Sequence, residues 1–191
     1  MATYISILRG INVSGQKKIK MEALKALYES LGLKNIIVYI QSGNVIFESK
    51  ETDIKKLTIK IEKRIKTSFG FDVVVFIKSK NDLQKIFSKN PFTKKDPKSI
   101  YITFLSDIPE NIPTEEINRV KDKSEEFVFL GKEIFLFCPN GYGRTKLSNN
   151  FFEGKLKLSA TTRNWNTINK LLRLLSIKNR NIIFNKNEAL L

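Results

Sequence analysis

Residues that can bind an anion gather at a few turns and strand ends of this sequence. The first group lies in Leu8-Arg9-Gly10-Ile11-Asn12-Val13-Ser14-Gly15, where a short apolar run enters a loop. Glycines permit positive φ and close approach of the backbone, and Arg9 can offer a bidentate fork to phosphate or carboxylate. The spacing fits neither the P-loop nor the dinucleotide-binding fingerprint. The structural alternative is a loop in which Asn12 caps its own backbone and Arg9 pairs with a carboxylate such as Glu22 or Glu48.

Two further polar groups have the same character. The segment 39–44 concentrates amides and a hydroxyl at one hairpin turn, for which turn chemistry alone is the alternative. The segment 160–167 surrounds the single tryptophan with polar groups, which suits stacking on a base or packing in a domain interface. Lys146 follows a glycine-containing loop and can also be an ordinary lysine at a helix start. The candidate ligand-binding residues are Arg9, Asn12, Gln41, Asn44, Lys146, Arg163, Asn164 and Trp165.

Other kinds of site lack their usual residues. The chain has no histidine, which removes Ser/His/Asp and Cys/His nucleophile systems and the common zinc and iron sites. The single cysteine, Cys138, lies in an apolar run, so an internal disulfide is impossible and a buried thiol is expected. No metal site is expected, and the cofactors and the catalytic residues stay unknown.

Hydrophobic periodicity predicts the elements that position these residues. Strand, helix, hairpin, helix and strand follow one another up to residue 77, with the second helix beginning at Thr52 or Asp53 and buried on Ile54, Leu57, Ile61 and Ile65. This βαββαβ order is typical of a ferredoxin-like unit, an antiparallel sheet with both helices on one face. A short helix over 81–88 and a linker come next.

The same order is predicted again beyond the linker. Strands over 100–105, 126–130 and 133–138 enclose a helix over 114–121, and a helix over 145–152, a strand over 155–161 and a closing helix over 164–176 follow. We therefore predict an α+β fold of two tandem ferredoxin-like units with added helices. The expected parts are a first unit at 1–78, a helical linker at 79–97, a second unit at 98–176 and a C-terminal tail at 177–191, to which no fold role is assigned.

Charge and composition allow two interpretations. The formal net charge of +15 favours binding to nucleic acid, because cationic side chains that neutralise phosphates release counterions. Most of the basic residues are lysine, however, and they are dispersed as on the solvated face of a helix. No secretory signal or stretch long enough to span a membrane is found, so a cytoplasmic protein without membrane partners is expected.

The stretches 8–15, 39–45, 90–91, 139–141, 146–147 and 160–167 together resemble the bacterial domain-of-unknown-function 1697 family. The resemblance covers residues 2–176, and it implies an α+β fold and a cytoplasmic protein without an established activity. In that family the first loop usually carries two adjacent glycines. Here Ser14 takes the first place and Gly15 the second, which weakens the case for a ligand held by a glycine pair.

Three functions remain as hypotheses. The first is binding of a small anionic ligand, phosphate- or nucleotide-like, in a cleft between the two units, where loops at strand ends converge. The lack of histidine and of a carboxylate pair favours binding or metal-assisted phosphoryl chemistry over acid–base hydrolysis. The second is a nucleic-acid binding module, although the surface aromatic signature of that class is missing. The third is a homo-oligomeric scaffold, and the oligomeric state is not determined by the sequence.

Overall fold

The structure, a computed structural model, describes residues 1–13 and 15–188, with the backbone alone at 177–188. Ser14, at which the loop departs from the glycine pair, and the last three residues of the predicted tail lie outside the described residues. Within the described part, the fold is α+β, with two four-stranded antiparallel sheets and six α-helices.

The N-terminal unit contains the first sheet and the two helices that cover it. Its strand order is β2-β3-β1-β4, which leaves β2 and β4 at the edges. Its elements are β1 (Ala2–Leu8), α1 (Met21–Ser30), β2 (Lys34–Tyr39), β3 (Asn44–Ser49), α2 (Ile54–Phe69) and β4 (Val75–Ser79).

The C-terminal unit contains the second sheet, whose order β6-β7-β5-β8 repeats the first for the corresponding strands. Its elements are β5 (Ile100–Leu105), α4 (Thr114–Val120), β6 (Glu126–Leu130), β7 (Glu133–Phe137), α5 (Asn149–Leu156) and β8 (Ala160–Asn164). Between and after the two units lie α3 (Lys80–Ser88) and α6 (Trp165–Glu188), and two 3-10 turns occupy Pro97–Ser99 and Tyr142–Arg144.

The capping residues and the spacing of apolar side chains explain where α2 begins, which face it buries and where it ends. Asp53 accepts hydrogen bonds from the backbone N–H groups of Lys55 and Lys56, which satisfies two donors at the helix N-terminus. The buried side chains of Leu57, Ile61 and Ile65 recur every four residues and face the sheet, as their spacing predicts. The helix ends at Gly70, whose φ of 80° is the left-handed conformation typical of a helix C-terminus.

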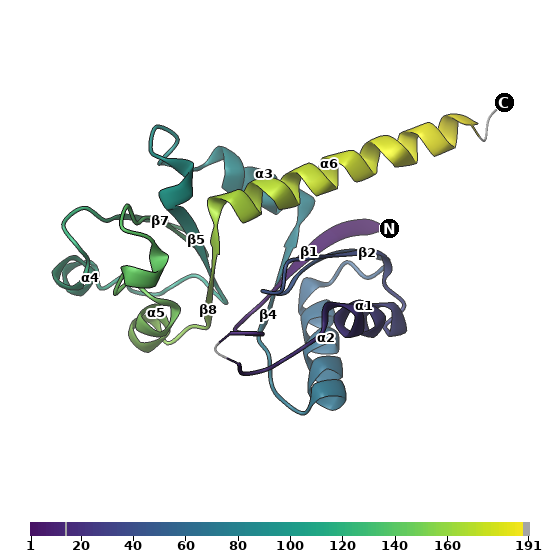
Figure 1. Ribbon diagram of the computed structural model, residues 1–191, viewed down its shortest axis with the longest axis horizontal. Helices are drawn as coiled ribbons and strands as arrows, with labels where there is room; N and C mark the ends of the chain where they lie inside the picture. Colours follow the sequence, from purple (N-terminus) through teal and green to yellow (C-terminus); the bar gives the residue numbers. More distant parts are fainter. Residues whose placement is uncertain (14, 189–191) are drawn as a thin grey trace.

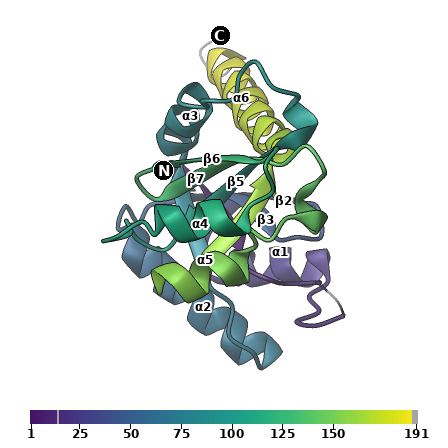
Figure 2. The ribbon, with the colours of Figure 1, turned by 90° about the vertical axis from the view of Figure 1, so that its left-hand side faces the viewer.

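Three apolar cores hold these layers together. The first fills the space between the N-terminal sheet and α1 and α2, and the third fills the space between the C-terminal sheet and α4 and α5. The second joins the inner faces of both sheets to α3 and α6. In Figure 1 the outer helices accordingly lie on opposite sides of the molecule, and α3 and α6 lie above the sheets. Figure 2 shows α3 and α6 next to one another, and they are in contact.

Two predicted boundaries near the C-terminus are wrong. The strand expected over 155–161 begins later in the chain, at Ala160, and is β8 (Ala160–Asn164). Residues 155–156 are instead the end of α5, which stops where Lys157 adopts a left-handed φ of 57°. The polar sequence of β8 forms a strand because it pairs with β5, with Thr162 opposite Thr103. The closing helix expected to end at Ser176 continues to Glu188, so part of the predicted tail is helical.

Candidate functional site

The two motifs at opposite ends of the chain meet at Arg163. This residue lies on β8 opposite Ile102, so its side chain faces the inner side of the C-terminal sheet and reaches the N-terminal unit. The guanidinium donates to groups at the ends of β1 and β3 and on its own strand: the Asn44 side-chain oxygen (2.7 Å), the carbonyls of Leu8 (2.8 Å), Ser42 (2.7 Å) and Thr162 (2.8 Å), and the Thr161 hydroxyl (3.0 Å).

Every acceptor of Arg163 is a neutral group. Arg163 is 8% exposed, and burial lowers the pKa of its guanidinium to about 10. Asn44 is fully buried, and its amide nitrogen donates to the Tyr39 carbonyl and the Ser42 hydroxyl, both at 3.2 Å. Arg163 and Asn44 therefore form a buried polar joint between the two units.

A second link between the units starts at Arg9. Its guanidinium forms an ion pair with Glu153 on α5 and donates to the side-chain oxygen of Asn150 at 3.2 Å. Glu153 also accepts a hydrogen bond from the Ala160 backbone N–H at 2.8 Å, which fixes α5 to the start of β8. The sequence suggested that Arg9 pairs with a carboxylate such as Glu22 or Glu48. That pairing is wrong, because the carboxylate partner of Arg9 is Glu153 in the other unit.

Asn12 holds the shape of the opening loop. Its amide nitrogen donates to the carbonyls of Ile19 and Gln41, both at 2.9 Å, and its oxygen accepts from the Ile19 N–H at 2.8 Å. Its φ of 55° is the left-handed conformation that asparagine tolerates better than most residues. The Gln41 side chain is exposed beside this loop. Asn12 and Gln41 border a hollow of about 630 Å³ that also includes Lys18, Lys20 and Met21 at the start of α1.

The remaining predicted residues are separated from this hollow. The Asn164 oxygen accepts from the Thr167 N–H at 2.7 Å and so caps α6. Trp165 is 7% exposed and stacks on Phe87 of α3, with ring centroids 5.1 Å apart and planes 11° apart. Lys146 is exposed and has no described hydrogen-bond or ion-pair partner. The eight candidates are thus divided among links between the units (Arg9, Asn44, Arg163), a loop (Asn12, Gln41), a helix cap (Asn164), a buried aromatic stack (Trp165) and the surface (Lys146), and they do not line one common cleft.

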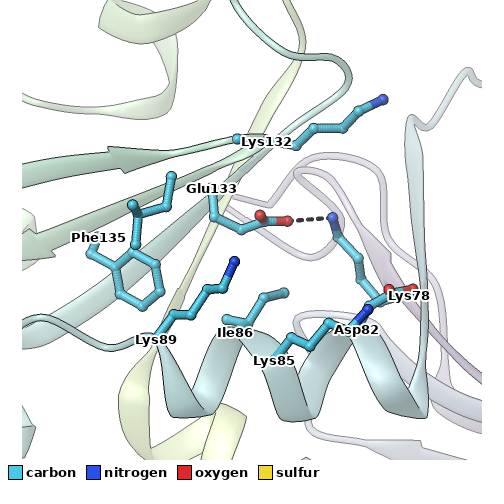
Figure 3. A pocket seen from close by; sticks show the side chains of 10 residues that line it. Lys78, Asp82, Lys85, Ile86, Lys89, Lys132, Glu133 and Phe135 are labelled. Carbon is cyan, nitrogen blue, oxygen red and sulfur yellow. Dashed lines mark hydrogen bonds and ion pairs between the residues drawn. The ribbon is translucent and has the colours of Figure 1, made fainter.

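A lysine-rich cleft between the units was not found from the sequence. It has a volume of about 350 Å³ and lies between β4 and α3 on one side and the β6–β7 hairpin on the other. Figure 3 shows its side chains, with Ile86 and Phe135 forming apolar walls. Its charged residues are Lys78, Asp82, Lys85, Lys89, Lys132 and Glu133. We call it the lysine cleft.

The two carboxylates of the lysine cleft already have partners. Asp82 accepts from the Ser79 backbone N–H at 3.0 Å and from its hydroxyl at 2.6 Å, which completes the N-terminal cap of α3. Glu133 forms an ion pair with Lys78, each side chain 14% exposed, and Lys132 pairs with Asp107 at 2.7 Å. Lys85 and Lys89 have no described carboxylate within ion-pair distance, so the cleft carries an excess of positive charge. In the sequence, the signal for this pair is the spacing of four residues at the end of one helix, with Lys85 in its last turn and Lys89 directly after it.

Cys138 is a further residue whose environment the structure defines. Burial raises the pKa of its thiol to about 12, and the charge of Glu125 acts in the same direction. Folding therefore favours the neutral thiol. The resulting contribution to the free energy of unfolding is fully present below pH 9, and it decreases as the pH rises toward 12.

We expect the native protein to resist Ellman's reagent at about pH 8, because only thiolates react and Cys138 is buried and protonated. One thiol should be titrated after unfolding in guanidinium chloride. Rapid labelling of the native protein with one equivalent would contradict this assignment.

Comparison with known proteins identifies the family. Residues 1–135 match the family described as "Protein of unknown function (DUF1697)", and the chain belongs to it. The chain is also similar to a solved structure, that of the conserved bacterial protein SP0830 from Streptococcus pneumoniae. Identity is 25%, the TM-score is 0.69, and the match covers 91% of this chain and 98% of the other. No curated protein matches the chain.

The described residues contain neither a cluster of metal ligands nor a membrane-spanning helix. Within residues 1–13 and 15–188, no group of three or more His, Cys, Asp or Glu side chains is placed to hold a metal ion. No helix in that part of the chain is long and apolar enough to cross a membrane.

Proposed function

We propose that this protein binds a small anionic ligand, phosphate- or nucleotide-like, in the lysine cleft between its two units. The observation that carries the proposal is the pair Lys85 of α3 and Lys89, the residue that follows α3, because both line the cleft without a described carboxylate partner. In Figure 3 the ammonium of Lys89 points toward the centre of the cleft, near Glu133 and Phe135. A tandem arrangement of two ferredoxin-like units at 1–78 and 98–176, and a cytoplasmic location, are parts of the same proposal.

The charges of the cleft suit a ligand with more than one negative charge. Asp82 is held by the cap of α3, and Glu133 neutralises Lys78 inside the cleft. An anion that enters can therefore pair with Lys85 and Lys89 without displacing an existing carboxylate. The apolar walls at Ile86 and Phe135 lower the local dielectric constant, which strengthens such pairs relative to pairs on an open surface.

The experiment is calorimetric titration with inorganic pyrophosphate and with ADP at low salt. The double variant Lys85→Ala/Lys89→Ala should weaken binding at least about tenfold, because both unpaired cations are lost. The variant Glu133→Gln should strengthen binding, because it removes a negative charge that pairs with Lys78 across the cleft.

A second lysine-lined hollow provides the matched control. Lys56 and Lys60 lie four residues apart on α2 and border a hollow of about 400 Å³ on the N-terminal unit alone. The variant Lys56→Ala/Lys60→Ala removes the same charge with the same spacing and should leave binding unchanged. Equal losses in the two double variants, or no binding to the wild type at millimolar concentration, would overturn the proposal. A steep salt slope with single-stranded DNA instead of ADP would favour a nucleic-acid partner.

A further inference from the structure

The strand β4 has a free edge, because it pairs with β1 alone. The Arg9 backbone N–H donates to the Val74 carbonyl at 2.9 Å, so Arg9 and Val74 form a hydrogen-bonded pair of the ladder. In an antiparallel ladder such pairs alternate with pairs whose backbone groups point away from the partner strand. The residues of β4 that direct their N–H and C=O groups to the free edge are therefore Val75, Ile77 and Ser79.

Two of these three N–H groups are capped by carboxylates from neighbouring helices. The Val75 N–H donates to Glu62 of α2 at 2.9 Å, and the Ser79 N–H donates to Asp82 of α3 at 3.0 Å. Among the described residues, none accepts the Ile77 N–H or donates to its carbonyl. Since backbone donors and acceptors are almost always paired with protein groups or with water, the N–H and C=O of Ile77 at this cavity are open to solvent or to an added strand.

A cavity of about 400 Å³ lies along this edge, between α2, β4 and the C-terminal unit. Its apolar lining includes Ile54 and Ile59 of α2 and Leu105 at the end of β5, and Ile59 is 51% exposed. The lysines that line it differ in their partners. Lys132 pairs with Asp107 and Lys78 with Glu133, whereas the exposed Lys55 forms no described ion pair, although its charge acts on Asp107 from a greater distance. The cavity thus combines open backbone groups, an apolar wall and one cation outside any described ion pair.

We infer that the free edge of β4 binds a short extended peptide segment, which pairs with the N–H and C=O of Ile77 as an added strand. Strand addition to a sheet edge beside a helix is an established mode of peptide recognition, in which backbone bonds give affinity and pockets give specificity. An apolar side chain of the peptide contacts Ile59, and an acidic group lies at Lys55. The caps at Val75 and Ser79 limit the added pairing to the middle of the strand, which prevents open-ended sheet growth.

This inference is independent of anion binding in the lysine cleft, because it uses the backbone of β4 and the α2 side of the strand. The first test is hydrogen exchange of the free protein by NMR. The amides of Phe76 and Lys78 face β1 and should exchange slowly, while the amide of Ile77 should exchange faster than either. If the Ile77 amide is as well protected from exchange as the amides of Phe76 and Lys78, the edge of β4 is not free and the inference is overturned.

The second test is titration with three acetylated and amidated pentapeptides, observed in amide chemical shifts. The acidic probe is Asp-Thr-Val-Thr-Asp, in which the central valine and the two aspartates share one face of the strand. The second probe replaces both aspartates by lysine, and the third carries proline at the central position of the acidic probe. The acidic probe should shift the Ile77 amide, and the lysine and proline probes should bind at least about tenfold more weakly, since proline lacks the backbone donor. Equal shifts from the acidic and proline probes, or no shift at all, would refute strand addition.

Variants of exposed residues complete the test without loss of the fold. Ile59→Asp should reduce affinity for the acidic probe at least about tenfold, because it replaces an apolar contact with a repelled charge. Lys55→Glu should act in the same direction. The control Ile112→Asp changes an isoleucine with 36% exposure outside the cavity and should leave the affinity unchanged. Wild-type affinity in Ile59→Asp would place the peptide elsewhere and overturn the inference.

Discussion

Replacing Arg163 by methionine is expected to lower the free energy of unfolding by about 3–5 kcal/mol. Methionine keeps much of the side-chain volume but removes every donor of the guanidinium. The carbonyls of Leu8 and Ser42 and the side-chain oxygen of Asn44 would then lose a donor in a buried joint. Urea unfolding followed by fluorescence of the single tryptophan measures the change directly, because Trp165 lies two residues from the substitution.

Two companion variants show which property of Arg163 matters. Arg163→Lys retains a charge but not the planar fork, so most of the loss should persist. Arg119→Met removes an arginine whose side chain is 76% exposed and pairs with Glu115 on the surface of α4, and it should cost less than about 1 kcal/mol. Stability of Arg163→Met within about 1 kcal/mol of wild type would show that the joint is dispensable, and the ligand-binding role predicted for Arg163 would regain support.

Replacing Gly43 by alanine is expected to lower the free energy of unfolding by about 2–4 kcal/mol. Gly43 has a φ of +75°, and an added Cβ would lie 2.5 Å from the Ile11 Cδ1 and 3.0 Å from the Leu8 Cβ. The substitution therefore combines backbone strain with overpacking between the hairpin turn and the opening loop. Thermal and urea unfolding both report the loss.

Gly10→Ala separates the two causes. Gly10 has a similar φ of +67°, but an added Cβ would meet no atom within 4 Å. Its loss should therefore be limited to backbone strain, about 1–2 kcal/mol. If the two alanine variants lose the same free energy of unfolding, the close contacts of the added Cβ at position 43 with Ile11 and Leu8 do not contribute to the loss.

Much of the secondary structure follows from local patterns. The period of Leu57, Ile61 and Ile65 together with Asp53 and Gly70 predicts α2, because capping and amphipathic spacing act over neighbouring residues. The strand β8 was misplaced because its sequence is polar, and only pairing with β5 makes it a strand. The extension of α6 beyond Ser176 was missed because its apolar residues are sparse.

The candidate site shows the same division. The polar motifs at 8–15, 39–45 and 160–167 are recognisable from their composition, and the structure brings the first and the last together through the Arg163 guanidinium and the Leu8 carbonyl. The role of the arginines in these motifs cannot be predicted from the sequence, because an arginine at a strand end can bind a ligand or a carbonyl group of the other unit. Arg163 and Arg9 both have protein partners from the other unit, more than a hundred residues away in sequence.

By itself, the sequence determined the order of most elements, the buried apolar faces and the residues with unusual polar character, because each depends on nearby residues. The tertiary structure alone decided which of those polar residues satisfy one another and which cations remain unpaired. Lys85 and Lys89 acquire significance only because the β6–β7 hairpin closes over α3, and Ile77 only because β4 ends its sheet. Both depend on the packing of two units whose contacts are distant in sequence, and no local pattern encodes that packing.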